Sequence, residues 1–379
     1  MTKPTLYLLP LEPLEERYTG AWWRWLPETF AEEFKVVAIA GVPLSLSVED
    51  GAFLDINSTL HYKASQLCEM ARLFRRREVR SGDSFFVADI EFWGIESIRY
   101  LARLQGIDVK IYGFLHAGSY TPGDFMVPMA DIGQFVEPAW VATCDKVFLG
   151  SEYHAELLRT TRLDAPAAHH LQDRLVVTGN PWRTAEAVQL AYEGREWREG
   201  RDIDVLFPHR PDAEKCPGTF VDFVQGMSKK LSLAFTTGRE QYRSTNDPDS
   251  VGRIMQLVGE GRAALFVQLK RADFYSVCRR AKVTVSTAVE ETFGYAMVEA
   301  MAQGSLPLMP SDLSYPMLVQ GDGRFLYERD NAEDFRRKLD VLLRLDGLAL
   351  QDAQDHIRAC CLALDGAEAR ILKVMVDDG

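Results

Sequence analysis

Two glutamates flanking a glycine turn form the stretch of the chain best suited to ligand chemistry. The segment ETFGYAMVE carries Glu291 and Glu299 eight residues apart, with Phe293 and Gly294 between them. Eight residues are a little over two helical turns, so on a helix both carboxylates share one face at different depths. Carboxylates placed in this way could bind hydroxyl groups at the two ends of an elongated ligand, such as a nucleotide sugar.

Two cations in one short segment form a second candidate for ligand binding. Arg210 and Lys215 are separated by four residues and follow the apolar run 204–208, so they lie at the end of an expected strand. An arginine fork can meet two phosphate oxygens, and a lysine adds a point charge. Groups placed where negative charge develops typically lower a barrier by a few kcal/mol each. The alternative is a solvated surface loop.

Both segments resemble one enzyme family. The run ETFGYAMVEAMAQGSLPLMP (291–310) is similar to the Glu-x7-Glu signature of retaining glycosyltransferases with the GT-B fold, and Arg210 to Lys215 resembles the family's Arg-x4-Lys. In that fold two Rossmann-like domains close on a nucleotide-sugar donor. The resemblance implies that Glu291 binds hydroxyls of the transferred sugar, that Glu299 binds the nucleotide ribose, and that the two cations bind the diphosphate. The alternative is a βαβ unit in which the glutamates only cap and solvate a helix.

The resemblance places a larger set of residues against the donor. Gly238 ends the strand-like run 233–238, where the family's pocket for the nucleotide base would lie. The expected donor-binding residues are Arg210, Lys215, Gly238, Glu291, Thr292, Phe293, Gly294 and Glu299. No D-x-D motif follows an N-terminal strand, so we expect no metal, with the two cations supplying the countercharge instead. We expect no cofactor, and a UDP-sugar as the donor substrate.

His116 ends the strand-like run IYGFLH (111–116) and precedes a loop of small residues that can approach a ligand closely. In the family a histidine at the matching place contacts the donor sugar near the reacting carbon. The resemblance therefore implies that His116 polarises the sugar rather than removing a proton. The alternative is a core histidine bonded to a neighbouring backbone group. The expected catalytic residues are His116, Arg210, Lys215 and Glu291.

The first half of the chain carries aromatic and charged side chains suited to an acceptor. The loop LEPLEERYTGAWWRWLPETF (11–30) lacks the glycine-rich fingerprint of a dinucleotide fold. Trp22 and Trp25 would face the same way on a helix, either packing it or offering a platform on which a sugar or an unstacked base stacks. The expected acceptor-binding residues are Glu15, Arg17, Tyr18, Trp22, Asp89, Trp93 and Ser119.

Three runs in this half resemble glycosyltransferases of tailed phages that modify hydroxymethylated DNA bases. They are LEPLEERYTGAWWRWLP, FLDINSTLHYKASQL (53–67) and IYGFLHAGSYTPGDF (111–125). The resemblance implies that the acceptor is a hydroxymethyl-pyrimidine in double-stranded DNA, such as hydroxymethylcytosine, extruded from the duplex and stacked. One alternative is transfer to a tRNA base, a glycan or a small molecule. Another is a sugar-nucleotide epimerase or a non-catalytic binding protein on the same fold.

A basic run lies near the end of the expected helix 62–77. Its members are Arg72, Arg75, Arg76, Arg77 and Arg80. Cations at a helix C-terminus complement the helix dipole and keep that face solvated. The alternative is contact with the phosphates of a polynucleotide acceptor.

Strand-like and helical runs alternate along the chain, which favours parallel sheets covered on both faces. The strand-like runs are 5–10, 34–39, 84–89, 108–116, 146–151, 174–179, 204–208, 233–238, 264–269, 283–287, 306–310 and 324–327. We expect an α/β GT-B fold whose two Rossmann-like domains face each other across a cleft. The expected bounds are 1–184 for the acceptor-side domain, 185–201 for a linker, 202–348 for the nucleotide-sugar domain and 349–379 for a helix returning towards the first domain.

Length and composition fit a cytoplasmic protein of two domains. The 379 residues are 47% apolar, enough for two cores. The net charge of −12 argues against attraction of nucleic acid to the whole surface but allows a local basic groove. The six cysteines form no C-x-x-C pair and indicate reduced thiols. Without a signal peptide or a membrane-length apolar run, we expect a soluble protein with no membrane partner, in the bacterial host cytoplasm if phage-encoded.

The resemblance therefore implies a retaining, metal-independent hexosyl- or pentosyltransferase that moves a sugar from a nucleotide-diphosphate sugar to a hydroxyl group. In such a reaction the acceptor hydroxyl attacks from the side on which the nucleotide leaves. The cations Arg210 and Lys215 would stabilise the departing diphosphate, while Glu291 and His116 would orient the sugar.

Overall fold

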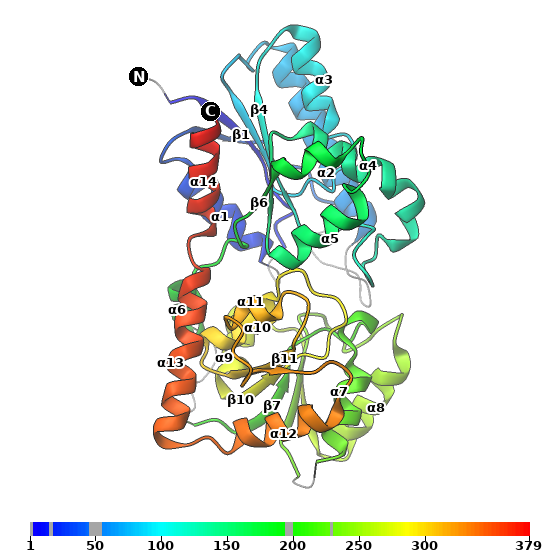
Figure 1. Ribbon diagram of the computed structural model, residues 1–379, viewed down its shortest axis with the longest axis vertical. Coiled ribbons are helices and arrows are strands. Elements are labelled where there is room, and N and C mark those ends of the chain that lie inside the picture. The colour runs from blue at the N-terminus through cyan, green and yellow to red at the C-terminus, as the bar shows by residue number, and fades with distance from the viewer. Residues whose placement is uncertain (1–2, 15–17, 45–54, 194–199, 228–229) are drawn as a thin grey trace. The chain divides into compact units, whose positions relative to one another are not determined.

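A computed structural model describes residues 3–14, 18–44, 55–193, 200–227 and 230–379. The chain divides into two compact units, which are described separately (Figure 1). Unit 1 contains the described residues up to Pro181 together with Gly366–Gly379, and unit 2 contains those of Trp182–Asp365. The expected fold class, an α/β chain with two parallel sheets, is confirmed.

Unit 1 is built on a parallel sheet of six strands in the order β2-β1-β3-β4-β5-β6. The strands are β1 (Thr5–Leu9), β2 (Lys35–Ala38), β3 (Ser84–Val87), β4 (Lys110–Leu115), β5 (Lys146–Leu149) and β6 (Leu175–Val177). The helical elements are α1 (Thr19–Phe30), α2 (Ile56–Arg75), α3 (Glu96–Gln105), η1 (Val127–Met129), α4 (Ala130–Thr143), α5 (Glu152–Arg162), η2 (His169–Arg174) and α14 (Ala367–Asp378). Because β3 and β4 are buried on both faces, they read as nearly unbroken apolar runs.

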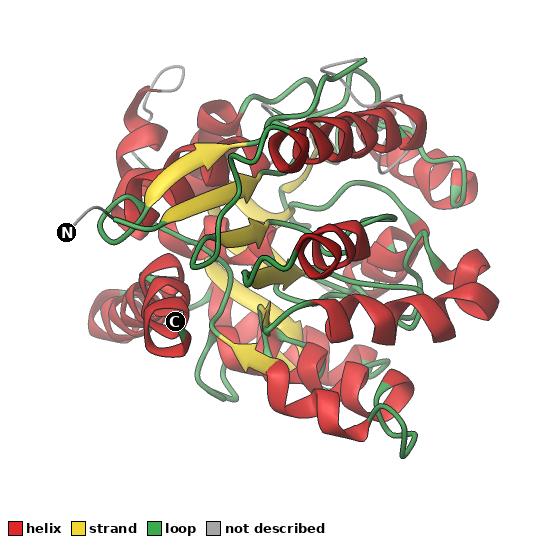
Figure 2. Cartoon of the chain, turned by 90° about the horizontal axis from the view of Figure 1, so that it is seen from above, coloured by secondary structure: helices red, strands yellow, loops and turns green. Residues whose placement is uncertain are grey.

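Unit 2 repeats this plan with a parallel sheet of six strands in the order β12-β11-β10-β7-β8-β9. The strands are β7 (Ile203–Phe207), β8 (Leu233–Thr236), β9 (Ala263–Phe266), β10 (Ala281–Val285), β11 (Leu306–Pro310) and β12 (Leu326–Tyr327). The helical elements are α6 (Thr184–Glu193), η3 (Ala213–Lys215), α7 (Pro217–Gln225), α8 (Pro248–Gly259), α9 (Arg271–Arg280), α10 (Tyr295–Ala302), α11 (Tyr315–Leu318), α12 (Ala332–Leu343) and α13 (Gly347–Leu364). In each unit helices lie beside the strands (Figure 1), and Figure 2 shows strands flanked by helices from a second direction.

The strand order of unit 2 reverses between β7 and β10, which are hydrogen-bonded neighbours. The chain leaves β7 towards β8 on one side of the sheet and leaves β10 towards β11 on the other. In open α/β sheets, ligands bind outside the carboxyl ends of the strands at such a switch point. The loops after β7 and β10 therefore occupy the position where unit 2 is expected to bind a ligand.

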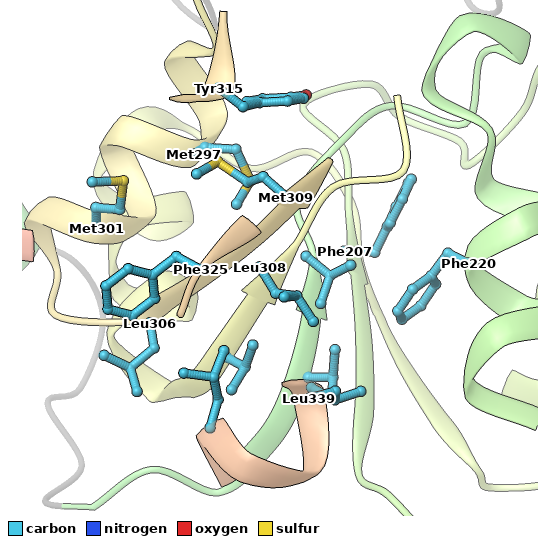
Figure 3. Close-up of a cluster of buried hydrophobic side chains, with 14 of the residues drawn as sticks. Phe207, Phe220, Met297, Met301, Leu306, Leu308, Met309, Tyr315, Phe325 and Leu339 are labelled. Carbon is cyan, nitrogen blue, oxygen red and sulfur yellow. The ribbon is translucent and has the colours of Figure 1, made fainter. Parts of the chain in front are cut away.

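The core of unit 2 fixes the ends of these strands. Phe207 of β7 stacks on Phe220 of α7, with ring centroids 5.2 Å apart. Met297 of α10, Leu308 of β11 and Leu339 of α12 are buried in the same cluster (Figure 3). Such packing leaves the polar residues that follow each strand to form the ligand-facing edge.

The domain bounds in the structure differ from the expected ones. The expected linker 185–201 is helical in its described first part, because α6 continues to Glu193 and packs on α9 within unit 2. The expected single helix 349–379 is two helices, α13 and α14, separated at Asp365 and Gly366. Gly366 has a left-handed backbone, with φ of +77°, which ends one helix direction and starts another.

The last helix, α14, belongs to unit 1. Its Ile371 and Met375 lie in one buried cluster with Trp22 and Trp25 of α1. The hydroxyl of Tyr112 donates to the carbonyl of Met375 over 3.1 Å. Within the described ranges, no helix combines the length and apolar character needed to cross a membrane.

Candidate functional site

The loops after β7 and β10 are joined by hydrogen bonds at the switch point of unit 2. The backbone N–H of Val289 donates to the carbonyl of Glu214 over 2.9 Å. The hydroxyl of Thr287 donates to the carbonyls of Lys215 and Cys216, over 3.1 and 2.9 Å. These bonds hold the two loops in register, so the side chains that they carry have fixed neighbours.

Lys215 is the buried cation of this junction, with only 6% of its surface exposed. Its Nζ lies 3.3 Å from Oε2 of Glu291 and donates to the carbonyl of Glu290 over 3.0 Å. Burial disfavours the charged form, but Glu291 and Glu290 outweigh burial and raise the pKa of Lys215. The ammonium group is therefore charged and positioned at neutral pH, as a phosphate-binding group must be.

Arg210 is enclosed by carboxylates of its own loop. Its Nε donates to Asp212 and its Nη2 donates to Glu214. Asp212 also accepts a hydrogen bond from Arg239 over 3.0 Å. Burial disfavours the charge of Arg210, but Glu214 and Asp212 more than offset it, so the pKa of Arg210 is raised. A phosphate that approaches the Arg210 guanidinium would meet these two carboxylates beside it.

Glu291 is held between Lys215 and the start of α10. Its Oε1 accepts the backbone N–H of Gly294 over 3.0 Å, which places the carboxylate at the positive end of the helix. Gly294 has φ of +99°, and a Cβ at that position would lie 3.0 Å from Cδ1 of Leu318. Only glycine fits there, which explains the glycine that follows Phe293.

The expected donor-binding residues around Glu291 differ in exposure. Phe293 is 2% exposed and packs on Tyr295, with ring centroids 4.9 Å apart, so it supports the turn from inside the core. Thr292 is partly buried in the same turn. Gly238 is exposed directly after β8, at the same carboxyl edge of the sheet.

Glu299 lies farther along α10 and has partners of its own. Its Oε1 is 2.8 Å from Nη1 of Arg271, and it accepts the hydroxyl of Tyr275 over 3.2 Å. Burial raises the pKa of Glu299, while Arg271 and Tyr275 act in the opposite direction. Arg210, Lys215 and Glu291 therefore form one charged group, and Glu299 belongs to a neighbouring one.

His116 follows β4 in unit 1, and both of its ring nitrogens have partners. Nε2 lies 2.9 Å from the carbonyl of Ala88, and Nδ1 lies 3.2 Å from the hydroxyl of Tyr18. Burial lowers the pKa of His116, so the ring is neutral. Nε2–H then donates to the carbonyl, and Nδ1 accepts from Tyr18. The ring has the backbone hydrogen bond expected of a core histidine, and its other nitrogen is bonded to Tyr18.

Asp89 and Trp93 follow β3 and are accessible in part. Oδ2 of Asp89 accepts from Nζ of Lys63 over 2.8 Å. Trp93 is 39% exposed and contacts Trp140 edge-on, with ring centroids 5.5 Å apart. Among the expected acceptor residues that the structure describes, Trp93 therefore offers an exposed aromatic ring.

Ser119 is 4% exposed, which does not fit direct contact with an acceptor. Its hydroxyl accepts from Arg162 over 3.2 Å, and its backbone N–H donates to Glu137 over 2.6 Å. Glu137 in turn binds Arg162, with Oε2 2.5 Å from Nε. This buried network stabilises the loop that follows His116.

Trp22 does not form the expected stacking platform, since it is 2% exposed. Its ring meets Phe114 edge-on and lies against His116, each at a centroid distance of 5.0 Å. The indole therefore packs α1 on the sheet and contacts the ring of His116. Glu15 and Arg17 lie outside the described residues.

The basic run at the end of α2 lies at the opposite edge of the unit 1 sheet from Asp89 and His116. Helix α2 ends just before β3 begins at Ser84, so this run is at the amino ends of the strands. Asp89 and His116 follow β3 and β4 at the carboxyl ends. Arg72 and Arg76 are more than half exposed, each near a glutamate of the same segment. A role in binding a long polynucleotide stays a prediction.

Sequence reasoning missed five charged or polar residues around the donor-side groups. They are Asp212, Glu214, Arg239, Arg271 and Tyr275. Asp212 and Glu214 follow Arg210 at two and four residues, a local signal that could have been used. The contact of Arg271 with Glu299 depends on how α9 packs beside α10, and no spacing rule predicts it. Across the described ranges, no three His, Cys, Asp or Glu side chains are grouped to hold a metal ion.

No protein-family model matches the chain. Among curated proteins, the tRNA-queuosine alpha-mannosyltransferase of Drosophila melanogaster is 29% identical over 131 residues, which are 34% of this chain and 33% of that protein. The similarity thus spans about a third of the length of that relative.

Solved structures match over the whole chain. The sucrose-phosphate synthase of Thermosynechococcus elongatus superposes with a TM-score of 0.68 at 17% identity, covering 99% of this chain and 98% of that one. A UDP-forming trehalose-phosphate synthase of Burkholderia xenovorans gives 0.65 at 11% identity, covering 100% and 98%. Anabaena HepE in complex with UDP gives 0.64 at 12% identity, covering 99% and 100%. The chain therefore has the GT-B glycosyltransferase fold.

Proposed function

We propose that the chain is a retaining, metal-independent glycosyltransferase that moves a sugar from a UDP-sugar to an acceptor hydroxyl. The observation that carries this proposal is the group formed by Arg210, Lys215 and Glu291 at the switch point of unit 2. One buried cation, one partly buried cation and a carboxylate at the start of α10 suit a ligand with a diphosphate beside a hydroxyl-rich sugar. The UDP bound to Anabaena HepE, which shares the fold, is consistent with a uridine nucleotide here.

The proposed reaction breaks the bond between the anomeric carbon of the sugar and a phosphate oxygen. The electron pair leaves with UDP, and Arg210 and Lys215 stabilise the negative charge that develops on the diphosphate. The acceptor oxygen bonds to the anomeric carbon from the side on which UDP leaves, so the configuration is retained. The proton of the acceptor hydroxyl passes to the departing phosphate. Glu291 orients the sugar by accepting hydrogen bonds from its hydroxyl groups.

Binding of the diphosphate requires an exchange of ionic partners. In the structure, Glu214 and Asp212 hold Arg210, and Glu291 lies beside Lys215. A diphosphate would replace Glu214 on the Arg210 fork and approach Lys215. Glu291 would then be released from Lys215 and would turn to the sugar hydroxyls, while Gly294 continues to hold its other oxygen.

For the acceptor, we propose a modified base of a nucleic acid. Similarity to a tRNA-queuosine alpha-mannosyltransferase favours a tRNA base. The resemblance of three runs to phage enzymes favours a hydroxymethyl-pyrimidine in DNA instead. Trp93, partly exposed after β3, offers a ring on which either base could stack.

The test is a panel of purified UDP- and GDP-hexoses incubated with the chain and one acceptor at a time. Acceptors are bulk tRNA, hydroxymethylcytosine DNA, unmodified DNA and none, and release of free nucleoside diphosphate is measured with the mass of the acceptor. We expect release of nucleoside diphosphate together with addition of a hexose to the acceptor. The acceptor should be tRNA, or else hydroxymethylcytosine DNA with no transfer to unmodified DNA. Epimer formation without an acceptor, or no turnover with any donor, would contradict the proposal.

A further inference from the structure

Glu299 lies in the charged group next to that of Arg210, Lys215 and Glu291, and its two carboxylate oxygens have different surroundings. Oε1 lies 2.8 Å from Nη1 of Arg271 and accepts the hydroxyl of Tyr275 over 3.2 Å. Across the described residues, no hydrogen bond reaches Oε2. One oxygen is thus fixed by protein groups, and the other keeps its capacity to accept hydrogen bonds.

The two partners of Glu299 come from one helix and also contact each other. Arg271 is the first residue of α9 and Tyr275 lies one turn later, with α9 packed beside α10 (Figure 1). Nη1 of Arg271 donates to the hydroxyl of Tyr275 over 3.4 Å, and its guanidinium lies 5.9 Å from the centre of the ring. Arg271 and Tyr275, called the dyad below, therefore have a defined geometry, and both contact the same oxygen of the Glu299 carboxylate.

Burial explains why Glu299 needs Arg271 and Tyr275 as partners. Only 7% of the Glu299 side chain and 18% of the Arg271 side chain are exposed. A carboxylate buried to that extent is costly unless a cation and a hydrogen-bond donor compensate it. On the same helix, Met297 and Met301 point into the core, so α10 cannot turn to expose Glu299 without unpacking (Figure 3).

We propose that Arg271 and Tyr275 are positioning residues that hold Oε1 of Glu299 and so direct Oε2 at the ribose hydroxyls of the nucleotide. This inference rests on the proposed function. A single oxygen with two lone pairs can accept from two vicinal hydroxyls at once. The dyad therefore makes the site selective for a ribonucleotide over its 2′-deoxy analogue.

The competing explanation is that Arg271 and Tyr275 only stabilise the packing of α9 against α10. A role of that kind would stabilise the whole nucleotide site, so its loss would weaken UDP and 2′-deoxy-UDP equally. A positioning role predicts a loss that depends on the 2′-hydroxyl. The ratio of Kd for 2′-deoxy-UDP to Kd for UDP separates these explanations. A change that weakens both ligands equally leaves this ratio unchanged.

The experiment measures Kd of UDP and of 2′-deoxy-UDP by calorimetry for the wild-type chain and five variants. Arg271→Met and Tyr275→Phe remove the two donors, Arg271→Lys keeps the charge, and Glu299→Gln replaces the acceptor. Arg280→Met is the matched control, because Arg280 ends the same helix and pairs with Asp202 instead. Thermal unfolding of each variant checks that it is folded.

For the wild type we expect UDP to bind at least about tenfold more tightly than 2′-deoxy-UDP, since a hydrogen bond to a charged group contributes about 1.5–3 kcal/mol. Arg271→Met and Glu299→Gln should bring the ratio close to one by weakening UDP. Tyr275→Phe and Arg271→Lys should give intermediate ratios, and Arg280→Met should leave it unchanged.

Two results would overturn the inference. Equal weakening of both ligands by Arg271→Met and Tyr275→Phe would show that the dyad only stabilises this packing, and an unchanged ratio with unchanged affinity would show that it has no role. Failure of the wild type to bind UDP at all would overturn the proposed function as well, so the two failures are distinguishable.

Discussion

Nζ of Lys215 lies 3.3 Å from Oε2 of Glu291, although the two residues are 76 positions apart in the chain. The contact joins the loop after β7 to the loop after β10, the strands between which the sheet order reverses. In this contact the two side chains carry opposite charges and partly neutralise each other. A diphosphate sugar can satisfy both at once, because its phosphate pairs with the lysine and its hydroxyls donate to the carboxylate.

Replacing Lys215 by methionine should lower donor turnover by at least about a hundredfold, because a positioned cation on the leaving group typically contributes a few kcal/mol to the barrier. Turnover is measured as nucleoside diphosphate release. Lys282→Met is the matched control, since Lys282 pairs with Asp204 over 2.8 Å at the amino ends of β10 and β7. Equal turnover of the two variants would contradict a role for Lys215 in the reaction.

Replacing Glu214 by glutamine should tighten UDP binding about three- to tenfold. Glu214 accepts a hydrogen bond from the Arg210 guanidinium, and the exchange of partners proposed above displaces it when a diphosphate binds. Removing an ion pair of about 1 kcal/mol from the free state changes Kd about fivefold. Calorimetry with UDP provides the measurement, and Asp222→Asn, which changes an exposed partner of Arg253, is the control. Weaker binding of UDP by Glu214→Gln would mean that Glu214 positions Arg210 rather than competing for it.

Replacing Trp22 by alanine should destabilise the protein by about 3–5 kcal/mol, the usual cost of removing a buried indole. Trp93→Ala, which removes a partly exposed ring, should cost less than about 1 kcal/mol but should raise KM for the acceptor. Denaturant unfolding and acceptor kinetics measure the two effects. If the Trp22→Ala variant is as stable as the wild type but has a higher KM for the acceptor, Trp22 would be a stacking platform for the acceptor, as first expected.

Acidification should destabilise the protein through buried histidines. Burial, with a smaller contribution from His116, lowers the pKa of His154 to about 3. Because the pKa of an unfolded histidine is near 6.5, the unfolded state binds more protons between about pH 6.5 and pH 3. The stability that neutral His154 contributes above pH 6.5 is therefore lost as the pH falls through this window.

The variant His154→Gln isolates this effect, because glutamine can keep the hydrogen bond with Tyr120. The free energy of unfolding, measured from pH 7 to pH 4, should fall less steeply in the variant, by up to about 1.4 kcal/mol per pH unit. Identical slopes for the variant and the wild type would contradict a neutral, buried His154.

Much of the fold could be predicted from the sequence because buried parallel strands read as apolar runs. Val283 and Val285 of β10 and Leu306 and Leu308 of β11 are examples. The residues after each run then fall at the carboxyl edge of the sheet by a general rule of such folds. Arg210, Lys215 and Glu291 meet there for that reason.

The side-chain partners could not be predicted, because they depend on packing between segments distant in the sequence. Trp22 is buried partly by Met375, near the end of the chain. Arg271 and Glu299 meet only because α9 and α10 pack side by side. The helical spacing of two tryptophans shows that they share a face, but it does not show which surface covers that face.

The most direct test of the account compares the affinities of UDP and UMP for the wild type and for the double variant Arg210→Met, Lys215→Met. UMP lacks the second phosphate that the two cations are proposed to bind. The account predicts that the wild type binds UDP at least about tenfold more tightly than UMP, and that the double variant loses this difference while keeping its affinity for UMP. Equal affinity of the wild type for UDP and UMP, or an undiminished preference for UDP in the double variant, would contradict it.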